Sequence, residues 1–253
     1  MHFPVYLWVG SLAIHPHPVF EFLAYLVGAR LYAFFKARDG DVLGVETRWW
    51  IVAAAFVGAA LGSKLLVLAD HPQLTIDNLV TPLGLAEGKT VVGALLGALF
   101  AVEWTKRRLH VRRSTGDVFA IPLTVGITIG RIGCFLTGLD DNTYGLPASL
   151  PWAVDFGDGI PRHPTQLYEI AFLVMVLLPI LVWLRGRLPR EGDLFKVFMA
   201  AYLGFRLALE FLKPGDPILG LTAIQWACVG GLLWYARYLP GYFQLRRVAP
   251  AHG

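Results

Sequence analysis

VFAIPLTVGITIGRIGCFLT, from Val118 to Thr137, is an apolar run of about twenty residues that carries a single charge, Arg131. A run of this length spans the hydrocarbon core of a bilayer as a helix. Similar runs recur along the chain, separated by short polar loops. We predict seven spans, at Val19 to Phe35, Trp49 to Ala69, Thr90 to Trp104, Val118 to Thr137, Gln166 to Leu184, Leu194 to Leu212 and Leu221 to Tyr238. The whole chain, 1–253, is therefore expected to form one all-α integral membrane domain.

Composition agrees with a membrane protein and argues against a nucleic-acid-binding one. The 253 residues are 56% hydrophobic and 16% charged, whereas about a quarter of the residues are charged in an average soluble domain. The net charge of +4 comes from basic residues in short loops rather than from one basic face, so no nucleic-acid partner is expected. Cys134 and Cys228 lie inside apolar runs, and we expect free thiols rather than a disulfide or a zinc site.

The distribution of Lys and Arg predicts the orientation, because basic residues in short loops remain on the cytoplasmic side. One side holds Lys36, Arg38, Arg48, Lys106, Arg107, Arg108, Arg112, Arg113, Arg185, Arg187, Arg190, Lys196, Arg237, Arg246 and Arg247. The other side holds Lys89, Arg162 and Lys213. Seven spans with the N-terminus outside and the C-terminus inside satisfy this split, which indicates a multi-pass protein of the cytoplasmic (inner) membrane.

Polar residues of several spans fall at one depth, near the outer leaflet. They are Glu21, Lys64, Thr90, Arg131, Gln166, Tyr168, Glu169, Arg206 and Glu210. A charge inside a span costs several kcal/mol, so each one is a candidate functional residue. Together they predict a hydrated cavity that opens to the outer leaflet. The alternative is that Arg206 and Glu210 neutralise each other and that Lys64 and Glu21 extend to the headgroups.

Arg131 and Arg206 are the residues best suited to a ligand in such a cavity. A guanidinium binds oxyanions through two parallel hydrogen bonds, so a phospholipid phosphate is the expected ligand. The extracytoplasmic loop 138–165, between spans four and five, is long for a connector, and such loops often carry function. His163 in this loop is a candidate general base or, alternatively, a structural residue before the helix that starts near Pro164.

Several motifs resemble those of the prolipoprotein diacylglyceryl transferase family. The family's Gly-Arg-x-Gly motif is similar to residues 130–133, and its Arg-His-Pro-(Ser/Thr)-Gln-Leu-Tyr-Glu motif is present in full at residues 162–169. Its Phe-Arg-x-x-x-Glu-Phe stretch resembles residues 205–211, and its Tyr-Leu-Val-Gly stretch resembles residues 25–28. The resemblance covers most of the chain and implies the same seven-span topology.

The resemblance also implies an activity. Such enzymes transfer diacylglyceryl from phosphatidylglycerol to the lipobox cysteine of a prolipoprotein and release glycerol phosphate, without a metal or cofactor. The partners implied are therefore a phospholipid donor, a prolipoprotein and the bilayer. We assign catalysis to Arg131, Arg206, Glu210 and Glu21, and substrate binding to Lys64, Tyr25, Arg162, His163, Gln166, Tyr168 and Glu169.

The chain departs from the family pattern at positions where chemistry is expected. Val92 stands where the family has His, and Cys134 stands at a family Asn. A family acid is also missing after Gly138, although the insertion at residues 140–142 is expected to return a carboxylate nearby. Glu21 replaces a family Tyr, and in an apolar wall it is a candidate general base. The alternative is that Glu21 forms a structural ion pair with Arg131 or Lys64.

Three functions are therefore considered. The chain is a prolipoprotein diacylglyceryl transferase with a rearranged acid–base set, a paralogue that uses the same phospholipid with another acceptor, or a lipid-binding membrane protein without catalysis.

Overall fold

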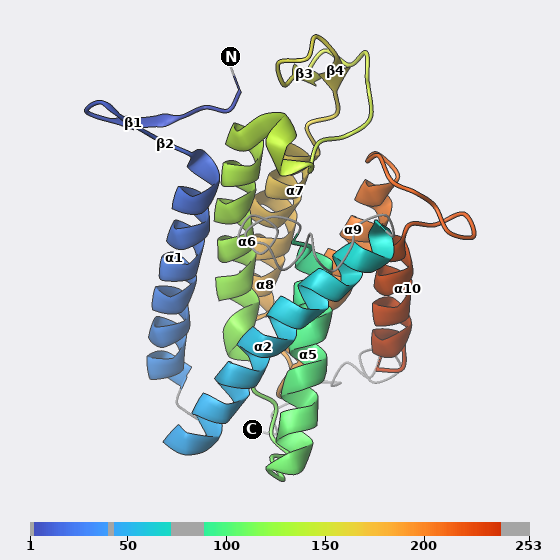
Figure 1. The fold of residues 1–253 in the computed structure, drawn as a ribbon. Coiled ribbons are helices and arrows are strands. Elements are labelled where there is room, and N and C mark those ends of the chain that lie inside the picture. Colours follow the sequence, from blue (N-terminus) through green and yellow to red (C-terminus); the bar gives the residue numbers. More distant parts are fainter. Residues whose placement is uncertain (1–2, 40–42, 72–88, 239–253) are drawn as a thin grey trace, which may run out of the picture.

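The computed structural model describes residues 3–39, 43–71 and 89–238, and most of them are helical. The helices are α1 (Pro16–Asp39), α2 (Val45–Asp70), α5 (Val91–Arg108), α6 (Asp117–Thr137), α7 (Thr165–Phe172), α8 (Leu178–Leu184), α9 (Asp193–Glu210) and α10 (Ala223–Ala236). A π-helical turn, η2 (Leu173–Leu177), joins α7 to α8 in one continuous rod. Each of the seven predicted spans coincides with a helix or with this rod, and the helices form one bundle (Figure 1). The first helix begins at Pro16 rather than Val19, since proline is well tolerated in a first turn.

Four of the helical segments are long and apolar enough to cross a membrane. They are Pro16–Asp39, Val45–Asp70, Asp117–Asp141 and Thr165–Leu184, and the apolar helix α10 is shorter. Large apolar side chains on the outside of the bundle, among them Phe22, Phe56 and Phe100, are more than two-thirds exposed. An apolar exterior over a packed interior is consistent with an all-α membrane protein.

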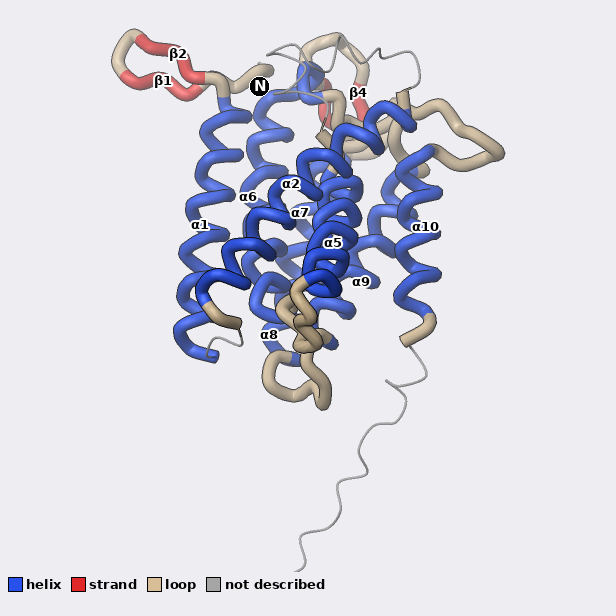
Figure 2. The backbone as a smooth tube through the Cα atoms, turned by 60° about the horizontal axis from the view of Figure 1, so that its bottom comes forward, coloured by secondary structure: helices blue, strands red, loops and turns tan. Residues whose placement is uncertain are grey.

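The first helices pack in pairs, α1 against α6 and α2 against α5. Two motifs of small residues bring the backbones of α2 and α5 into close contact. Gly58 and Gly62 on α2 face Gly93 and Gly97 on α5. A Cβ added at Gly97 would lie 2.2 Å from the carbonyl oxygen of Gly58. The spacing small-xxx-small allows two helix backbones to touch in this way in membranes. Figures 1 and 2 show α2 crossing α5 obliquely at this contact.

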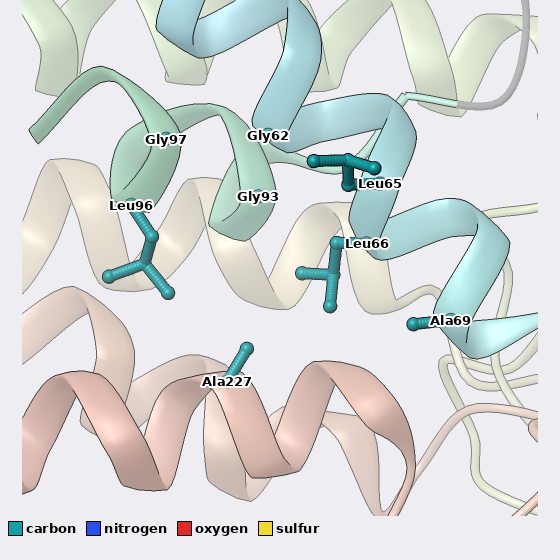
Figure 3. A pocket seen from close by; sticks show the side chains of 8 residues that line it. All are labelled: Gly62, Leu65, Leu66, Ala69, Gly93, Leu96, Gly97 and Ala227. Atoms are coloured by element: carbon teal, nitrogen blue, oxygen red, sulfur yellow. The ribbon is translucent and has the colours of Figure 1, made fainter. Parts of the chain in front are cut away.

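An apolar groove of about 280 Å³ lies between α2, α5 and α10 (Figure 3). It is lined by Gly62, Leu65, Leu66, Ala69, Gly93, Leu96, Gly97 and Ala227. No lining side chain carries a polar atom, so the groove offers no group for acid–base or phosphate chemistry. The buried charged side chains of Arg131, Glu169, Arg206 and Glu210 lie elsewhere, on α6, α7 and α9.

Besides the helices, the described residues include two short antiparallel strand pairs. Strand β1 (Leu7–Val9) pairs with β2 (Leu12–Ile14), and β3 (Val154–Asp155) pairs with β4 (Pro161–Arg162). Both pairs lie at the same end of the bundle (Figures 1 and 2). They form outside the apolar runs, where turns at positive-φ glycines allow the chain to reverse.

The loop between α6 and α7 is anchored to the bundle. It starts with a single 3₁₀ turn, η1 (Gly138–Asp141), directly after α6. Phe156 of this loop is 2% exposed and packs edge-to-face on Phe3 and Phe135, with ring centroids 5.1 and 5.9 Å apart. The loop is thereby held over the end of α6, where the predicted site residues lie.

Candidate active site

A buried carboxylate, Glu169 of α7, holds the two predicted phosphate-binding arginines together. Its Oε2 lies 2.9 Å from Arg131 Nε of α6 and 3.2 Å from Arg206 Nη1 of α9. Its other oxygen, Oε1, accepts a hydrogen bond of 2.7 Å from the hydroxyl of Tyr202. Glu169 is 1% exposed. We refer to these residues, together with Glu210, as the arginine cluster.

Arg206 and Glu210 form the pair that their spacing predicts. Arg206 Nη2 donates to Glu210 Oε2 over 2.7 Å, and both side chains are buried. The pair does not stand alone, since Arg206 also contacts Glu169. With both guanidiniums and both carboxylates ionised and Tyr202 neutral, the charges balance, so the arginine cluster has no net charge.

Lys213, three residues beyond Glu210, supplies a further positive charge at the edge of the arginine cluster. Burial and the charge of Arg206 lower the pKa of Lys213 from 10.5 to about 8, and the cluster's carboxylates act in the opposite direction. When Lys213 is protonated, it and the cluster carry one net positive charge. That charge matches the single negative charge of a phosphodiester.

A chain of hydrogen bonds leads from α7 to α1. Gln166 Nε2 donates to Thr143 Oγ1 over 3.1 Å, and Thr143 Oγ1 donates to Asp141 Oδ2 over 2.6 Å. The other oxygen of Asp141, Oδ1, lies 2.8 Å from His17 Nδ1. Asp141 comes from the insertion at residues 140–142, and it lies next to Cys134. The insertion thus brings a carboxylate to the region where the family acid is missing.

Cys134 occupies the space between this chain and the arginine cluster. Arg131 Nη1 lies 3.7 Å from Cys134 Sγ. Ligand-type atoms of Cys134, His17 and Asp141 all lie within 4.8 Å of one another, and these three residues can in principle hold a metal ion. Val92 is 1% exposed in the apolar core, so the helix on which the family carries its His offers no proton acceptor at that position.

Glu21 forms an ion pair, but with neither of the partners expected for it. Lys89 Nζ lies 2.7 Å from Glu21 Oε1, and the hydroxyl of Tyr25 donates to the same oxygen over 2.9 Å. His17 Nε2 lies 3.8 Å from Glu21 Oε2. This geometry favours the structural ion pair over the general base, with Lys89 in place of Arg131 or Lys64. Tyr25 is 63% exposed, on the outside of α1.

The loop residues before α7 contact one another and their neighbours rather than the arginine cluster. Arg162 pairs with Asp158 and lies over the ring of Tyr144 at 5.0 Å. His163 Nδ1 lies 3.1 Å from the hydroxyl of Tyr168, which also accepts a hydrogen bond of 2.8 Å from Trp152 Nε1. These contacts favour the structural interpretation of His163, and they give the loop a fixed shape over the site.

The remaining expected residues lie on α2 and at the start of α5. Lys64 is partly buried on α2, next to Ser63. Ser63 Oγ accepts a hydrogen bond of 2.9 Å from the Thr90 N–H, and Thr90 Oγ1 caps α5 by accepting from the Gly93 N–H. Thr90 therefore has a structural role. Tyr202, His17, Thr143 and Lys213 were not predicted as site residues from the sequence. Tyr202 lies four residues before Arg206, on the same helix face, and this spacing is the signal that points to it.

Comparison with known proteins agrees with the motifs. A family model described as prolipoprotein diacylglyceryl transferase matches residues 4–239. The chain belongs to the prolipoprotein diacylglyceryl transferase family. The arginine cluster and the other contacts of this site lie within the matched range.

Individual family members are similar over nearly their whole length. Three relatives are named phosphatidylglycerol–prolipoprotein diacylglyceryl transferase. The protein from Nitratidesulfovibrio vulgaris is 38% identical to this chain, and the match covers 96% of this chain and 93% of the relative. The proteins from Bordetella parapertussis and Pseudomonas aeruginosa are 32% and 31% identical, and the matches cover 87% and 94% of this chain and 86% and 90% of the relatives. The similarity thus extends across both the arginine cluster and the altered region around Cys134.

Proposed function

We propose that the protein is a phosphatidylglycerol-dependent diacylglyceryl transferase whose acceptor is the lipobox cysteine of a prolipoprotein. The observation that carries this proposal is the buried arginine cluster, in which Arg131 and Arg206 meet at Glu169 with Lys213 beside them. Family membership and the names of the relatives support the donor and the acceptor.

The proposed setting is the bacterial inner membrane, with seven spans, the N-terminus outside and the C-terminus inside. Support comes from the lopsided distribution of Lys and Arg and from the helices found at each predicted span. Arg108, Arg187 and Arg237 lie over the rings of Trp104, Trp183 and Trp234, at the end that we assign to the cytoplasm. Tryptophan and arginine at helix ends are typical of a membrane interface.

In the proposed reaction the acceptor sulfur, as thiolate, forms a bond to the terminal glyceryl carbon of the diacylglyceryl group. The bond from that carbon to the phosphate oxygen breaks, and glycerol phosphate leaves with the bonding electron pair. Negative charge grows on the phosphate as the bond breaks. Fixed guanidiniums of Arg131 and Arg206 stabilise that charge, the effect that is worth most in a water-excluded site.

The arginine cluster can bind a phosphodiester without losing its internal ion pairs. Within the described part of the chain, Arg206 Nε is buried without a hydrogen-bond acceptor, which leaves a donor for a phosphate oxygen. The Gln166 Oε1 atom is likewise buried without a donor and suits a headgroup hydroxyl. Lys213 supplies the compensating charge. Glu210 and Glu169 then hold the guanidiniums in place rather than contact the reacting carbon.

A paralogue with the same donor and another acceptor is the second candidate. It is favoured by the buried Val92 at the family His position and by Cys134 at the family Asn position.

The test combines complementation of a conditional transferase-deficient bacterium with an assay of the purified protein, labelled phosphatidylglycerol and a lipobox peptide. Rescue and labelled peptide support the transferase. Glycerol phosphate release without labelled peptide supports the paralogue. Lipid binding without either product contradicts both candidates and leaves a non-catalytic lipid-binding protein. Arg131→Ala is the control for the donor site, and unchanged lipid binding in that variant would contradict the phosphate assignment.

A further inference from the structure

We infer that His17, Cys134 and Asp141 form a binding site for one divalent transition-metal ion of the zinc type. The three residues come from α1, α6 and η1, and one ligand-type atom of each lies within 4.8 Å of the other two. The resemblance to the family implies no metal. This ligand set depends on Cys134, at which the chain departs from the family pattern.

The arrangement is a closed triangle rather than a line. In a nucleophilic triad the histidine lies between the thiol and the carboxylate, which do not meet. Here the thiol of Cys134 is close to both His17 and Asp141, and His17 Nδ1 lies 2.8 Å from Asp141 Oδ1. Three donor atoms that surround one point in this way have the arrangement of ligands around a metal ion.

The donor chemistry fits zinc or a similar ion. Imidazole nitrogen, thiolate sulfur and carboxylate oxygen are its usual protein ligands, with bonds of roughly 2.0 to 2.3 Å. A tetrahedral ion with these bond lengths sets its ligand atoms roughly 3.2 to 3.8 Å apart. Metal binding would lengthen the 2.8 Å contact between His17 Nδ1 and Asp141 Oδ1 and bring all three ligand atoms, now within 4.8 Å of one another, into this range. Three protein ligands leave one position open.

Outer-shell contacts support the same assignment. A metal-bound histidine commonly donates its other ring N–H to a carboxylate, which fixes the ring. His17 Nε2 faces Glu21 Oε2 at 3.8 Å, and Glu21 is held in turn by Lys89. The second oxygen of Asp141 accepts from Thr143, which fixes that carboxylate as well.

The charges also balance. A thiolate and a carboxylate together neutralise a divalent cation, which matters in a mostly buried site. Cys134 is 8% exposed and the Asp141 side chain 9% exposed. Arg131 Nη1 lies 3.7 Å from the sulfur of Cys134, and the charge of Arg131 is paired with Glu169.

The experiment uses the full chain in nanodiscs, purified through a tag without histidine. Elemental analysis after dialysis against a weak chelator is expected to find about one zinc ion per chain. The cobalt-substituted protein is expected to show thiolate-to-cobalt charge-transfer absorption in the near ultraviolet. Both signals should be lost in Cys134→Ser, His17→Asn and Asp141→Asn.

Cys228→Ser is the matched control, since Cys228 is also a free, buried cysteine but lies in α10. It should keep the zinc and the cobalt spectrum. Glu21→Gln should lower zinc affinity by about 10- to 100-fold, as expected for an outer-shell carboxylate. Folded wild-type protein that retains no metal and gives no thiolate-to-cobalt band would overturn the inference, and so would equal loss of metal in Cys228→Ser. Neither result depends on transferase activity, so metal binding and the proposed function can fail separately.

Discussion

The hydroxyl of Tyr202 donates a 2.7 Å hydrogen bond to Glu169 Oε1 in the middle of the bundle, where both side chains are buried. The other oxygen of Glu169 contacts Arg131 and Arg206. Tyr202 and the two arginines therefore fix the orientation of one carboxylate, and that carboxylate sets the separation of the guanidiniums. The geometry of the donor site depends on a residue that touches neither lipid nor acceptor in the proposed reaction.

Tyr202→Phe removes this donor and leaves Glu169 Oε1 buried without it. A lost hydrogen bond to a charged group costs about 1.5 to 3 kcal/mol. We expect the free energy of unfolding to fall by about that amount and the KM for phosphatidylglycerol to rise, measured by denaturation in mild detergent and by initial rates. Tyr32→Phe, at a tyrosine that stacks on Phe119 of α6, is the control and should change neither value. Full activity and stability in Tyr202→Phe would argue against a positioning role.

Arg131 and Glu169 allow charge balance and ligand binding to be separated in a double-mutant cycle. Arg131→Gln leaves a buried carboxylate with one fewer partner, and removal of one member of a buried pair costs about 3 to 5 kcal/mol. Arg131→Gln/Glu169→Gln restores neutrality, so stability should partly recover. Activity should remain about 100-fold or more below wild type, because the phosphate has lost a guanidinium. Recovery of activity together with stability would contradict the role of Arg131 at the phosphate.

Protonation of Lys213 should make the activity toward phosphatidylglycerol depend on pH. Its pKa is lowered to about 8, so the free protein loses this charge as the pH rises through that value. We expect kcat/KM for phosphatidylglycerol to fall there. In Lys213→Arg the fall near pH 8 should disappear, since arginine stays protonated. Lys213→Met should be slow at all pH values, and an unchanged inflection in that variant would assign it to another group.

The same lysine affects stability in the opposite direction. The unfolded chain binds the proton with a pKa near 10.5 and the folded chain with a pKa of about 8. Between these values the unfolded state holds more protons, so the free energy of unfolding should rise with pH. Denaturation of wild type and Lys213→Met between pH 8 and 10 measures this slope, which should be smaller in the variant.

The helices and the charged members of the arginine cluster were predictable because each depends on local sequence. Apolar runs marked every helix, and the cost of buried charge singled out Arg131, Glu169, Arg206 and Glu210. Their pairing was only partly predictable. Arg206 and Glu210 are four residues apart on one helix, whereas the contact of Glu169 with Arg131 depends on how α6 packs against α7.

The contacts of α1 could not be predicted for a similar reason. Glu21 was expected near Arg131 or Lys64 because all three share one depth, but depth does not specify which helix faces are adjacent. The structure instead pairs Glu21 with Lys89. His17 was overlooked because the span was drawn from Val19, while two prolines allow the helix to begin at Pro16. The small-xxx-small motifs of α2 and α5 are visible in the sequence, but the spacing alone does not identify which two helices meet.

Glu21 and Lys89 are partly exposed, so their pair should contribute little to stability, at most about 1 kcal/mol. Lys89→Met and Glu21→Gln should therefore have similar small effects on the denaturation midpoint. If the pair is structural, the two variants should also reduce turnover to a similar small extent. If turnover is abolished in Glu21→Gln and kept in Lys89→Met, Glu21 is the general base after all.

Gly97 tests the closest backbone contact in the bundle. A Cβ at this position would meet the Gly58 carbonyl oxygen at 2.2 Å and the Gly62 Cα at 2.8 Å. Both are backbone atoms and cannot rotate away, so Gly97→Ala should separate α2 from α5 and destabilise the protein by about 1 to 3 kcal/mol, the range for overpacking. Gly230→Ala on α10, where nothing lies within 4 Å of the new Cβ, is the matched control and should leave stability unchanged or raise it slightly. Thermal denaturation in one detergent compares the two variants. Equal melting temperatures would mean that the α2–α5 contact is looser than the structure describes, because only a separated pair of helices has room for the added methyl group.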